Sequence, residues 1–382
     1  MKRLVVCCDG TWNQWSGGQA TNVVKMARAI ALTAPGDAPG QRIPQIVFYD
    51  EGVGTGNLID RVKGGLFGYG LDKNVEDAYR FLVNNYEEGD EICLFGFSRG
   101  SYTARSTTGL IRKCGLLKKP NGHKLGEAMT LYRRRDSSAD SNEATSFRKS
   151  YSHPEPGPPS EERYAYVVRV HFIGVWDTVG SLGVPLRSLR WIPWNNRYKF
   201  HDQRLSSTVK NAVHAVSIDE KRGGFAPTLW DEVPALGQKV EQVWFAGVHS
   251  EVGGGNRDSS LSNLALGWMV DKARECGLAF DEDQVRQIKA TANPRERVDT
   301  SLSGVWRFLL PYARRLGLTK PGAAGPPNSE SLHPSVCVKL NTESPPYRPQ
   351  NVLEYLKRPD RKIAAAGPEP WNQPPANQYP DL

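Results

Sequence analysis

The chain has 382 residues, 39% of them hydrophobic and 24% charged, a composition that excludes a largely disordered protein. Its net charge of +8 favours contact with anionic surfaces, either nucleic acid or acidic phospholipid. No apolar run is long enough to span a membrane, and the start MKRLVVCCDG is too weakly apolar for a cleaved secretory signal. We therefore expect a protein made in the cytoplasm, and delivery elsewhere by a route without a signal peptide stays open.

The six cysteines predict neither disulfides nor a metal site. Cys7, Cys8 and Cys93 lie inside apolar runs, and no C-x-x-C or Cys/His spacing typical of zinc ligands occurs. We expect reduced core residues, no metal and no cofactor.

Short apolar runs alternate with helical patterns along the chain. The expected strands are residues 4–8, 44–49, 91–97, 164–177, 211–219 and 240–249. The expected helices are residues 21–32, with Thr21 or Asn22 as cap, 72–86, with Asp72 as cap, 99–113 and 261–275. This alternation predicts an α/β fold with a mainly parallel sheet and right-handed crossovers.

One domain over residues 1–357 is preferred, with insertions near residues 118–163, 182–206 and 290–330. Within the first insertion, residues 134–163 are rich in Ser, Asp, Arg and Pro and predict a mobile segment. The Pro-rich residues 358–382 predict a disordered tail.

Two further segments have open interpretations. Residues 191–200 are aromatic and basic, which suits either a lid over an acyl pocket or a structural insertion. Residues 304–318 mix apolar bulk with arginines at roughly helical spacing. They predict a helix that lies on a membrane surface or packs on the core.

The sequence Gly96-Phe97-Ser98-Arg99-Gly100 stands between an expected strand and an expected helix. Chance supplies a G-x-S-x-G pattern readily, so the pattern alone is weak. In this setting it is typical of a nucleophile elbow, in which Gly96 and Gly100 relieve crowding and Ser98 is exposed.

Asp177 and His249 stand at the ends of two later expected strands. Because reactive groups collect at the carboxyl ends of parallel strands, Ser98, Asp177 and His249 predict a catalytic triad in the chain order of α/β-hydrolases. Asp9 and Asp50 remain alternatives for the acid, whereas His214 lies mid-strand and is expected to be a hydrogen-bonded core residue.

A serine hydroxyl needs an imidazole to take its proton, and a carboxylate must orient that imidazole. The developing oxyanion needs backbone N–H donors as well. We expect the amide of Arg99 as one donor and the amide of Gly10 or Thr11, after the first strand, as the other.

Several stretches together resemble the α/β-hydrolase catalytic domain of type VI secretion phospholipase effectors and its uncharacterised relatives. They are CCDGTWN with TNV, GFSRGSYTAR, GVWDTVGS, HAVSIDE with FAPTLW, and FAGVHSEVGGG. Ser101 and Glu251 depart from the family pattern, where alanine and aspartate are expected.

The resemblance implies an α/β-hydrolase-like sheet with helices on both faces and lid-like insertions. It also implies the Ser98, Asp177, His249 triad and hydrolysis of a lipid ester, with the acyl ester of a glycerophospholipid as the expected substrate. The implied partners are a lipid substrate, a membrane surface, an immunity protein and a secretion spike protein, with delivery into a neighbouring cell.

Two other functions stay open. A non-catalytic module could hold anionic lipid or a partner protein through its basic and aromatic surface. Nucleic-acid binding has only the net charge in its favour, because no recognition motif occurs, and it is not expected.

Overall fold

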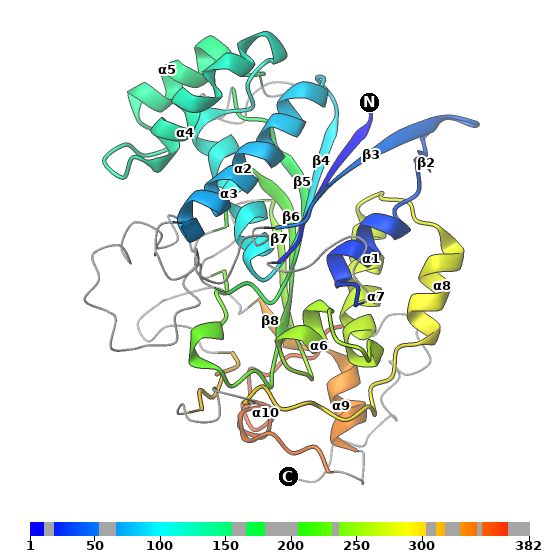
Figure 1. The fold of residues 1–382 in the computed structure, drawn as a ribbon. Helices are drawn as coiled ribbons and strands as arrows, with labels where there is room; N and C mark the ends of the chain where they lie inside the picture. Colours follow the sequence, from blue (N-terminus) through cyan, green and yellow to red (C-terminus); the bar gives the residue numbers. More distant parts are fainter. Residues whose placement is uncertain are drawn as a thin grey trace.

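A single mainly parallel sheet organises the computed structural model (Figure 1). The structure describes residues 1–10, 19–52, 66–154, 166–179, 205–230, 237–302, 311–317, 329–341 and 346–365. Within these residues the strand order is β2-β3-β1-β4-β5-β6-β7-β8, and all neighbours pair in parallel except β2 and β3. The strands are β1 Arg3–Cys8, β2 Thr33–Pro35, β3 Arg42–Asp50, β4 Glu91–Phe97, β5 Val170–Trp176, β6 Val209–Ser217, β7 Lys239–Phe245 and β8 Glu330–Leu332.

Helices cover both faces of this sheet (Figure 1). They are α1 Asn22–Ala29, α2 Leu66–Asn85, α3 Arg99–Cys114, α4 Leu125–Arg133, α5 Asn142–Tyr151, α6 His249–Gly253, α7 Ser260–Glu275, α8 Glu282–Ala290, α9 Pro334–Leu340 and α10 Gln350–Leu356, with the 3-10 turns η1 Lys119–Lys124 and η5 Gly223–Phe225. The predicted fold class, an α/β-hydrolase-like sheet between two helical layers, is confirmed.

The two-residue period of the strands divides the core into two layers. In β1, Leu4, Val6 and Cys8 pack under α2 and α3, while Val5 and Cys7 pack under α1 and α7. Every residue of β1 is buried, as its uninterrupted apolar sequence predicts for a central parallel strand. A third, smaller cluster joins the ends of β6 to β8 with α9 and α10.

The first expected insertion contains ordered helices. Residues 119–133 form η1 and α4, and Ser141 caps α5 by accepting a hydrogen bond from the amide of Ala144. Ala144 and Phe147 bury one face of α5 in the core. The prediction of a mobile segment is therefore wrong for residues 142–151, because a capped helix with an apolar stripe follows the polar stretch.

The last described residues lie against the edge of the sheet. The amide of Leu332 donates to the carbonyl of Lys362 at 2.9 Å, and the amide of Ala364 donates back to Leu332 at 2.8 Å. The rest of the expected tail, most of the 182–206 insertion and residues 303–310 and 318–328 lie outside the described residues. The domain boundary at residue 357 stays a prediction.

In the described part of the chain, none of the helices is both long and apolar enough to cross a membrane.

Two glycines let α3 approach the sheet closely. A Cβ atom at Gly100 would lie 2.0 Å from the carbonyl oxygen of Cys8, and one at Gly96 would lie 2.5 Å from the carbonyl oxygen of Gly100. Both contacts are with backbone atoms, which have little freedom to move. Because Gly96 and Gly100 have no side chains, the first turn of α3 can pack directly against the ends of β1 and β4.

We expect Gly100→Ala to lower the free energy of unfolding by about 1–3 kcal/mol, because the added methyl group would overpack against backbone atoms that have little freedom to move. Gly126→Ala in α4 is the matched control, since a Cβ atom there has no neighbour within 4 Å. The control should be neutral or stabilising by up to about 1 kcal/mol. Urea unfolding of both variants measures the difference, and equal stabilities would contradict this close approach.

Candidate active site

The three residues predicted for the triad each come after the carboxyl end of a strand of the sheet. Ser98 follows β4, Asp177 follows β5, and His249 begins α6 shortly after β7. The last residues of β4 and β5, Phe97 and Trp176, are directly paired. The amide of Ser98 donates to the carbonyl of Trp176 at 3.1 Å, so the chain segments that carry Ser98 and Asp177 leave the sheet side by side.

Ser98 and Asp177 share an unusual backbone conformation. Among the described residues they are the only non-glycine residues with positive φ, at 57° and 35°. Ser98 has a ψ of −116°, far from helix and strand values, and precedes the first residue of α3. Such conformations cost about 1–3 kcal/mol each and concentrate at functional sites.

Asp177 and His249 form a buried pair. The Nδ1 atom of His249 lies 2.6 Å from Oδ2 of Asp177, and both side chains are almost completely shielded from solvent. A carboxylate at Nδ1 favours the tautomer that carries its proton there. Nε2 of His249 is then left with the lone pair that a general base needs.

The carboxylate of Asp177 has a second charged partner, Arg314. The Nη1 and Nη2 atoms of Arg314 lie 2.6 and 3.0 Å from the two oxygens of Asp177, in a two-pronged contact. Arg314 is completely buried and also donates to the carbonyls of Ser217 and Phe225, at 2.7 and 2.6 Å. It therefore connects Asp177 to the end of β6 and to η5.

The charge on Asp177 is stabilised against its burial. Desolvation alone would raise the pKa of this carboxyl, but the charge of Arg314 and the hydrogen bond with His249 hold the pKa well below its ordinary value. With the amide of Ser217 at 3.0 Å, the two oxygens of Asp177 accept four hydrogen bonds. Asp177 is thus ionised throughout the neutral range.

Arg314 corrects one expectation from the sequence. Residues 304–318 were expected to form a surface helix, but residues 311–317 are not helical and Arg314 points into the core. The spacing of the arginines therefore predicted the wrong local structure. Arg314 is drawn into the core by the buried carboxylate of Asp177, which lies 137 positions earlier in the chain. Residues 303–310 and Leu318 lie outside the described residues.

The two alternative acids have other contacts. Asp9 accepts hydrogen bonds from Thr21 at 2.5 Å and from Tyr49 at 2.8 Å. Asp50 accepts from the amide of Gly52 at 3.3 Å, and burial raises its pKa to about 6. Of these three carboxyl groups, Asp177 is the one found in hydrogen-bond contact with His249.

His214 is a core residue, as expected. It is completely buried, its Nε2 accepts a hydrogen bond from the amide of Thr178 at 3.1 Å, and its ring packs edge-on against Trp230. Burial lowers its pKa to about 3, which keeps the ring neutral. Neutral His214 supports the backbone just after Asp177.

The three residues expected to supply oxyanion donors lie in different settings. Arg99 is the first residue of α3, directly after Ser98, so its amide stands at the start of the helix. The amide of Gly10 donates to Oδ1 of Asp9 at 2.7 Å, within its own loop. Thr11 lies outside the described residues. The oxyanion roles of Arg99, Gly10 and Thr11 stay predictions.

Aromatic rings fix the position of His249. Its imidazole lies 4.6 Å from the ring of Phe97 and 5.0 Å from the ring of Phe225, measured between ring centroids. A Cβ atom at Gly253 would lie 1.9 Å from the ring of Phe97, so α6 rests directly on the residue before Ser98. The segments carrying Ser98 and His249 are therefore in contact through Phe97.

Two buried glutamates flank His249. Oε2 of Glu220 lies 3.4 Å from the amide of His249 and also pairs with Arg222. Glu251 accepts hydrogen bonds from the amides of Val248 and Asp299, at 2.8 and 3.0 Å, and caps α6. Burial raises the pKa of Glu251 to about 7.

The departures from the family pattern have local structural explanations. The hydroxyl of Ser101 lies 2.8 Å from the carbonyl oxygen of Gly96 and 3.0 Å from that of Trp176, at the ends of the paired strands β4 and β5. Glu251 reaches back to cap its own helix. Both side chains stabilise backbone next to the triad positions.

The chain is an α/β protein of hydrolase-like fold with a mainly parallel sheet. At one end of this sheet lie a serine in a strained strand-to-helix turn and a buried Asp–His pair. The family model described as "T6SS, Phospholipase effector Tle1-like, catalytic domain" matches residues 2–272, so the chain belongs to this family.

An uncharacterized protein of Saccharomyces cerevisiae is 30% identical over 256 residues, which are 62% of this chain and 33% of the yeast protein. The chain thus spans about one third of the length of this relative. Two solved structures are similar over parts of the chain. A crystal structure of an uncharacterized protein from Pseudomonas aeruginosa has 19% identity and a TM-score of 0.44, and covers 76% of this chain and 48% of that one. A structure of the Tle1 effector bound to the VgrG spike from the type VI secretion system has 15% identity and a TM-score of 0.35, and covers 66% and 51%.

We expect Arg314→Met to lower the free energy of unfolding by about 3–5 kcal/mol at pH 7, because it leaves the charge of Asp177 buried with one partner fewer. Arg286→Met on the exposed face of α8 is the matched control and should change stability by no more than about 0.5 kcal/mol. Urea unfolding measures both variants. A loss for Arg314→Met as small as the control's would contradict the role given to Arg314.

The raised pKa of Glu251 predicts a pH-dependent stability. Because the folded protein holds this proton more tightly than the unfolded chain, wild-type stability falls as pH rises from about 4.5 to about 7. Glu251→Gln lacks this titration. The stability advantage of the wild type over the variant should therefore shrink between pH 5 and pH 7.5, in urea titrations at each pH. An advantage that is constant or grows would be inconsistent with a raised pKa.

Proposed function

We propose that the chain is a serine hydrolase that cleaves an acyl ester of a lipid. Ser98 is the nucleophile, His249 the general base and Asp177 the acid that orients it. The observation that carries the proposal is the buried Asp177–His249 hydrogen bond at the sheet edge where Ser98 stands in a strained turn. Membership in a family of phospholipase effector catalytic domains supports a glycerophospholipid substrate and a reaction of the phospholipase A type.

In the first half of the reaction, Nε2 of His249 takes the proton of the Ser98 hydroxyl as Oγ bonds to the ester carbonyl carbon. The carbonyl π electrons move to oxygen and form an oxyanion. The amide of Arg99 is our candidate donor to this oxyanion, and a single such donor contributes about 3–4 kcal/mol. The amide of Gly10, which donates to Asp9, or the amide of Thr11 is our candidate for the second donor.

Collapse of this intermediate breaks the bond between the carbonyl carbon and the alcohol oxygen. His249 returns its proton to that oxygen, which leaves as the lysophospholipid alcohol, and the acyl group stays on Ser98. His249 then takes a proton from water as the water oxygen bonds to the acyl carbon. The bond between this carbon and Oγ of Ser98 breaks, His249 returns the proton to Oγ, and the fatty acid leaves. During both steps the imidazolium charge lies 2.6 Å from the carboxylate of Asp177, which stabilises it.

Arg314 has a defined consequence for this mechanism. Its guanidinium donates to both oxygens of the Asp177 carboxylate. The same two-pronged contact fixes the carboxylate in position. Arg314 therefore holds Asp177 in the position from which its carboxylate orients His249.

By the same family membership, we propose that the protein acts as a type VI secretion effector. In this role it is made in the cytoplasm and delivered to a target cell, with a spike protein as carrier and an immunity protein as inhibitor. The net charge of +8 supports peripheral contact with anionic membranes.

Ser98→Ala should lower the rate of fatty acid release from diacyl phospholipid vesicles by about a million-fold, to the detection limit, because the nucleophile is lost. Ser150→Ala on the exposed face of α5 is the matched control and should retain the wild-type rate. Thermal unfolding of both variants checks that the fold is intact.

Turnover by Ser98→Ala at the wild-type rate would refute the assignment. If the wild type cleaves no ester but binds anionic vesicles, and Ser98→Ala binds equally well, the non-catalytic lipid-binding function is correct instead.

A further inference from the structure

An arginine and a glutamate form a mostly buried ion pair next to the candidate active site. The Nε and Nη2 atoms of Arg222 lie 2.9 and 2.7 Å from Oε1 and Oε2 of Glu220, and the amide of Arg222 also donates to Oε1 at 2.8 Å. The side chain of Glu220 has no exposure to solvent, and that of Arg222 is largely covered. The proposed triad mechanism uses neither side chain.

The pair is charged and has a defined geometry. Burial raises the pKa of the Glu220 carboxyl, but the hydrogen bond and the charge of Arg222 hold this pKa below its ordinary value. A guanidinium that meets a carboxylate through two bonds is fixed in orientation as well as in position. Glu220 therefore holds the plane of the Arg222 guanidinium in one direction throughout the neutral range.

The guanidinium of Arg222 lies on the ring of Phe225. Its Cζ atom is 3.8 Å from the centre of that ring, a close cation–π contact. Phe225 in turn contacts the imidazole of His249, with the ring centroids 5.0 Å apart and the ring planes at 72°. Glu220, Arg222, Phe225 and His249 therefore form a continuous series of contacts that ends on the proposed general base.

The backbone of Phe225 is held from another direction. Its carbonyl oxygen accepts a hydrogen bond at 2.6 Å from Arg314, which pairs with Asp177. Its amide donates to the carbonyl of Arg222 at 2.9 Å. Phe225 is thus connected to both members of the buried pair, to His249 through its ring and to Asp177 through Arg314.

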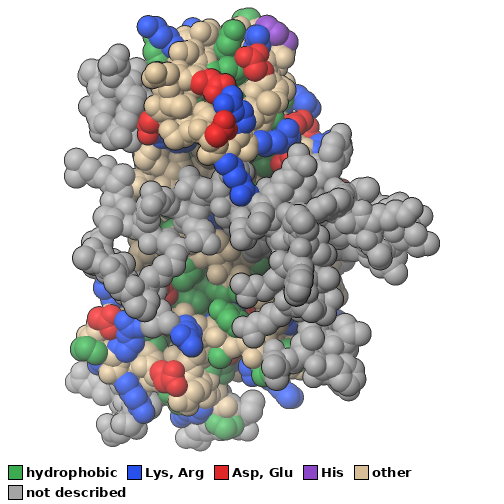
Figure 2. Space-filling view, turned by 90° about the vertical axis from the view of Figure 1, so that its left-hand side faces the viewer, with side chains coloured by type: hydrophobic (Ala, Val, Ile, Leu, Met, Phe, Trp, Pro, Cys, Tyr) green, Lys and Arg blue, Asp and Glu red, His purple; other side chains and the backbone are tan. Residues whose placement is uncertain are grey.

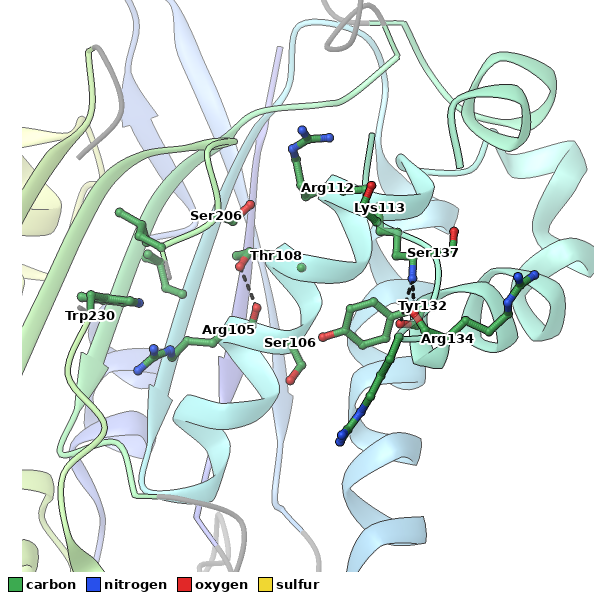
Figure 3. A pocket seen from close by; sticks show the side chains of 16 residues that line it. Arg105, Ser106, Thr108, Arg112, Lys113, Tyr132, Arg134, Ser137, Ser206 and Trp230 are labelled. Carbon is green, nitrogen blue, oxygen red and sulfur yellow. Dashed lines mark hydrogen bonds between the residues drawn. The ribbon is translucent and has the colours of Figure 1, made fainter. Parts of the chain in front are cut away.

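The segment that follows Phe225 is anchored to α3. The guanidinium of Arg105 donates to the carbonyl of Thr228 at 2.6 Å and lies 5.1 Å from the centre of the Trp230 ring. Arg105 and Trp230 also line a cavity of about 530 Å³ beside α3, and Figure 3 shows Arg105 reaching from this helix toward Trp230. Because α3 begins directly after Ser98, the segment that carries Phe225 is fixed relative to the proposed nucleophile.

The imidazole of His249 needs contacts on its ring as well as at Nδ1. The hydrogen bond to Asp177 fixes one atom, but the terminal torsion of a histidine side chain has broad minima, so the ring can still swing about that atom. Contacts with Phe97 and Phe225 restrict this motion. Phe97 is held by the strand β4, whereas Phe225 lies in the short turn η5 and has Arg222 against its ring.

We propose that Arg222, held by Glu220, is a positioning residue that acts on His249 through the ring of Phe225. The role rests on the proposed hydrolase function, in which His249 is the base. It also gives a purpose to two stretches noted in the sequence, HAVSIDE and FAPTLW, which contain Glu220 and Phe225 but none of the three proposed triad residues.

The test measures labelling of Ser98 by a fluorescent fluorophosphonate over a range of probe concentrations, which separates the maximal rate constant from the half-saturating concentration. Arg222→Lys keeps the positive charge but loses the planar, two-pronged contact. We expect this variant and Phe225→Leu each to lower the maximal rate constant by about 10- to 100-fold, because a small misplacement of a catalytic group has an effect of this size. The half-saturating concentration should not change.

Arg134→Lys is the matched control. Like Arg222, Arg134 makes a two-pronged contact with a carboxylate two positions away, since its Nε and Nη2 atoms lie 3.2 and 2.9 Å from the oxygens of Asp136. Arg134 follows the end of α4, and over α4 and α5 acidic and basic side chains are intermixed at the surface (Figure 2). This variant should be labelled at the wild-type rate.

A double-mutant comparison shows whether Arg222 acts through His249. In a His249→Gln background, Arg222→Lys and Phe225→Leu should have no further effect, because the imidazole that they position is absent. Phe225→Leu keeps the test decisive if Arg222→Lys does not fold.

An unchanged rate in either single variant, or slowing by the same factor in both backgrounds, would overturn the positioning role and leave the hydrolase function intact. A wild-type protein that is not labelled at Ser98 would refute the proposed function, and the positioning role with it.

Discussion

The negative charge of Asp177 is the constraint around which this part of the molecule is organised. A buried carboxylate is very unfavourable unless it is paired and hydrogen-bonded, and Asp177 has no exposure to solvent. Arg314, His249 and the amide of Ser217 together satisfy it. These partners come from three distant segments of the chain, so the charge fixes the ends of β5 and β6, the start of α6 and the 311–317 loop relative to one another.

The second constraint is the crowding where β4 turns into α3. Gly96 and Gly100 allow the first turn of the helix to contact the end of β1, and Ser98 between them takes a conformation that serine rarely adopts. The backbone strain at Ser98 and Asp177 together destabilises the fold by about 2–6 kcal/mol. Packing of the two core layers offsets this strain. The sheet thus supports two strained residues side by side at one edge.

Most of the fold, and the position of the three residues proposed as a triad at the carboxyl ends of the strands, could be predicted from the sequence. Ser98, Asp177 and His249 each follow an apolar run, and parallel strands bring their carboxyl ends together, so the edge could be inferred without coordinates. Choosing Asp177 over Asp9 and Asp50 required the contact with His249, because all three carboxylates follow strands. The position of a carboxylate after a strand does not by itself indicate whether its side chain contacts the imidazole of His249.

The sequence could not predict the partners that come from loops. Arg314 lies 137 residues from Asp177 in a segment whose arginines suggested a surface helix, and nothing local marks one of them as buried. The helix α5 was likewise concealed within a polar stretch, although its Ser141 cap and the spacing of Ala144 and Phe147 are recognisable afterwards. Long-range charge pairing and cavity shape depend on the assembled fold.

In the proposed mechanism, the turn at Ser98 and the Asp177–His249 pair form one reactive centre. Reaction of the wild-type protein with a fluorophosphonate, followed by mass spectrometry of its peptides, tests this most directly, because such probes modify only an activated serine. We expect one adduct, on Ser98, that forms much more slowly in the variant His249→Gln. An adduct on another serine, or a Ser98 adduct that forms equally fast without His249, would contradict it.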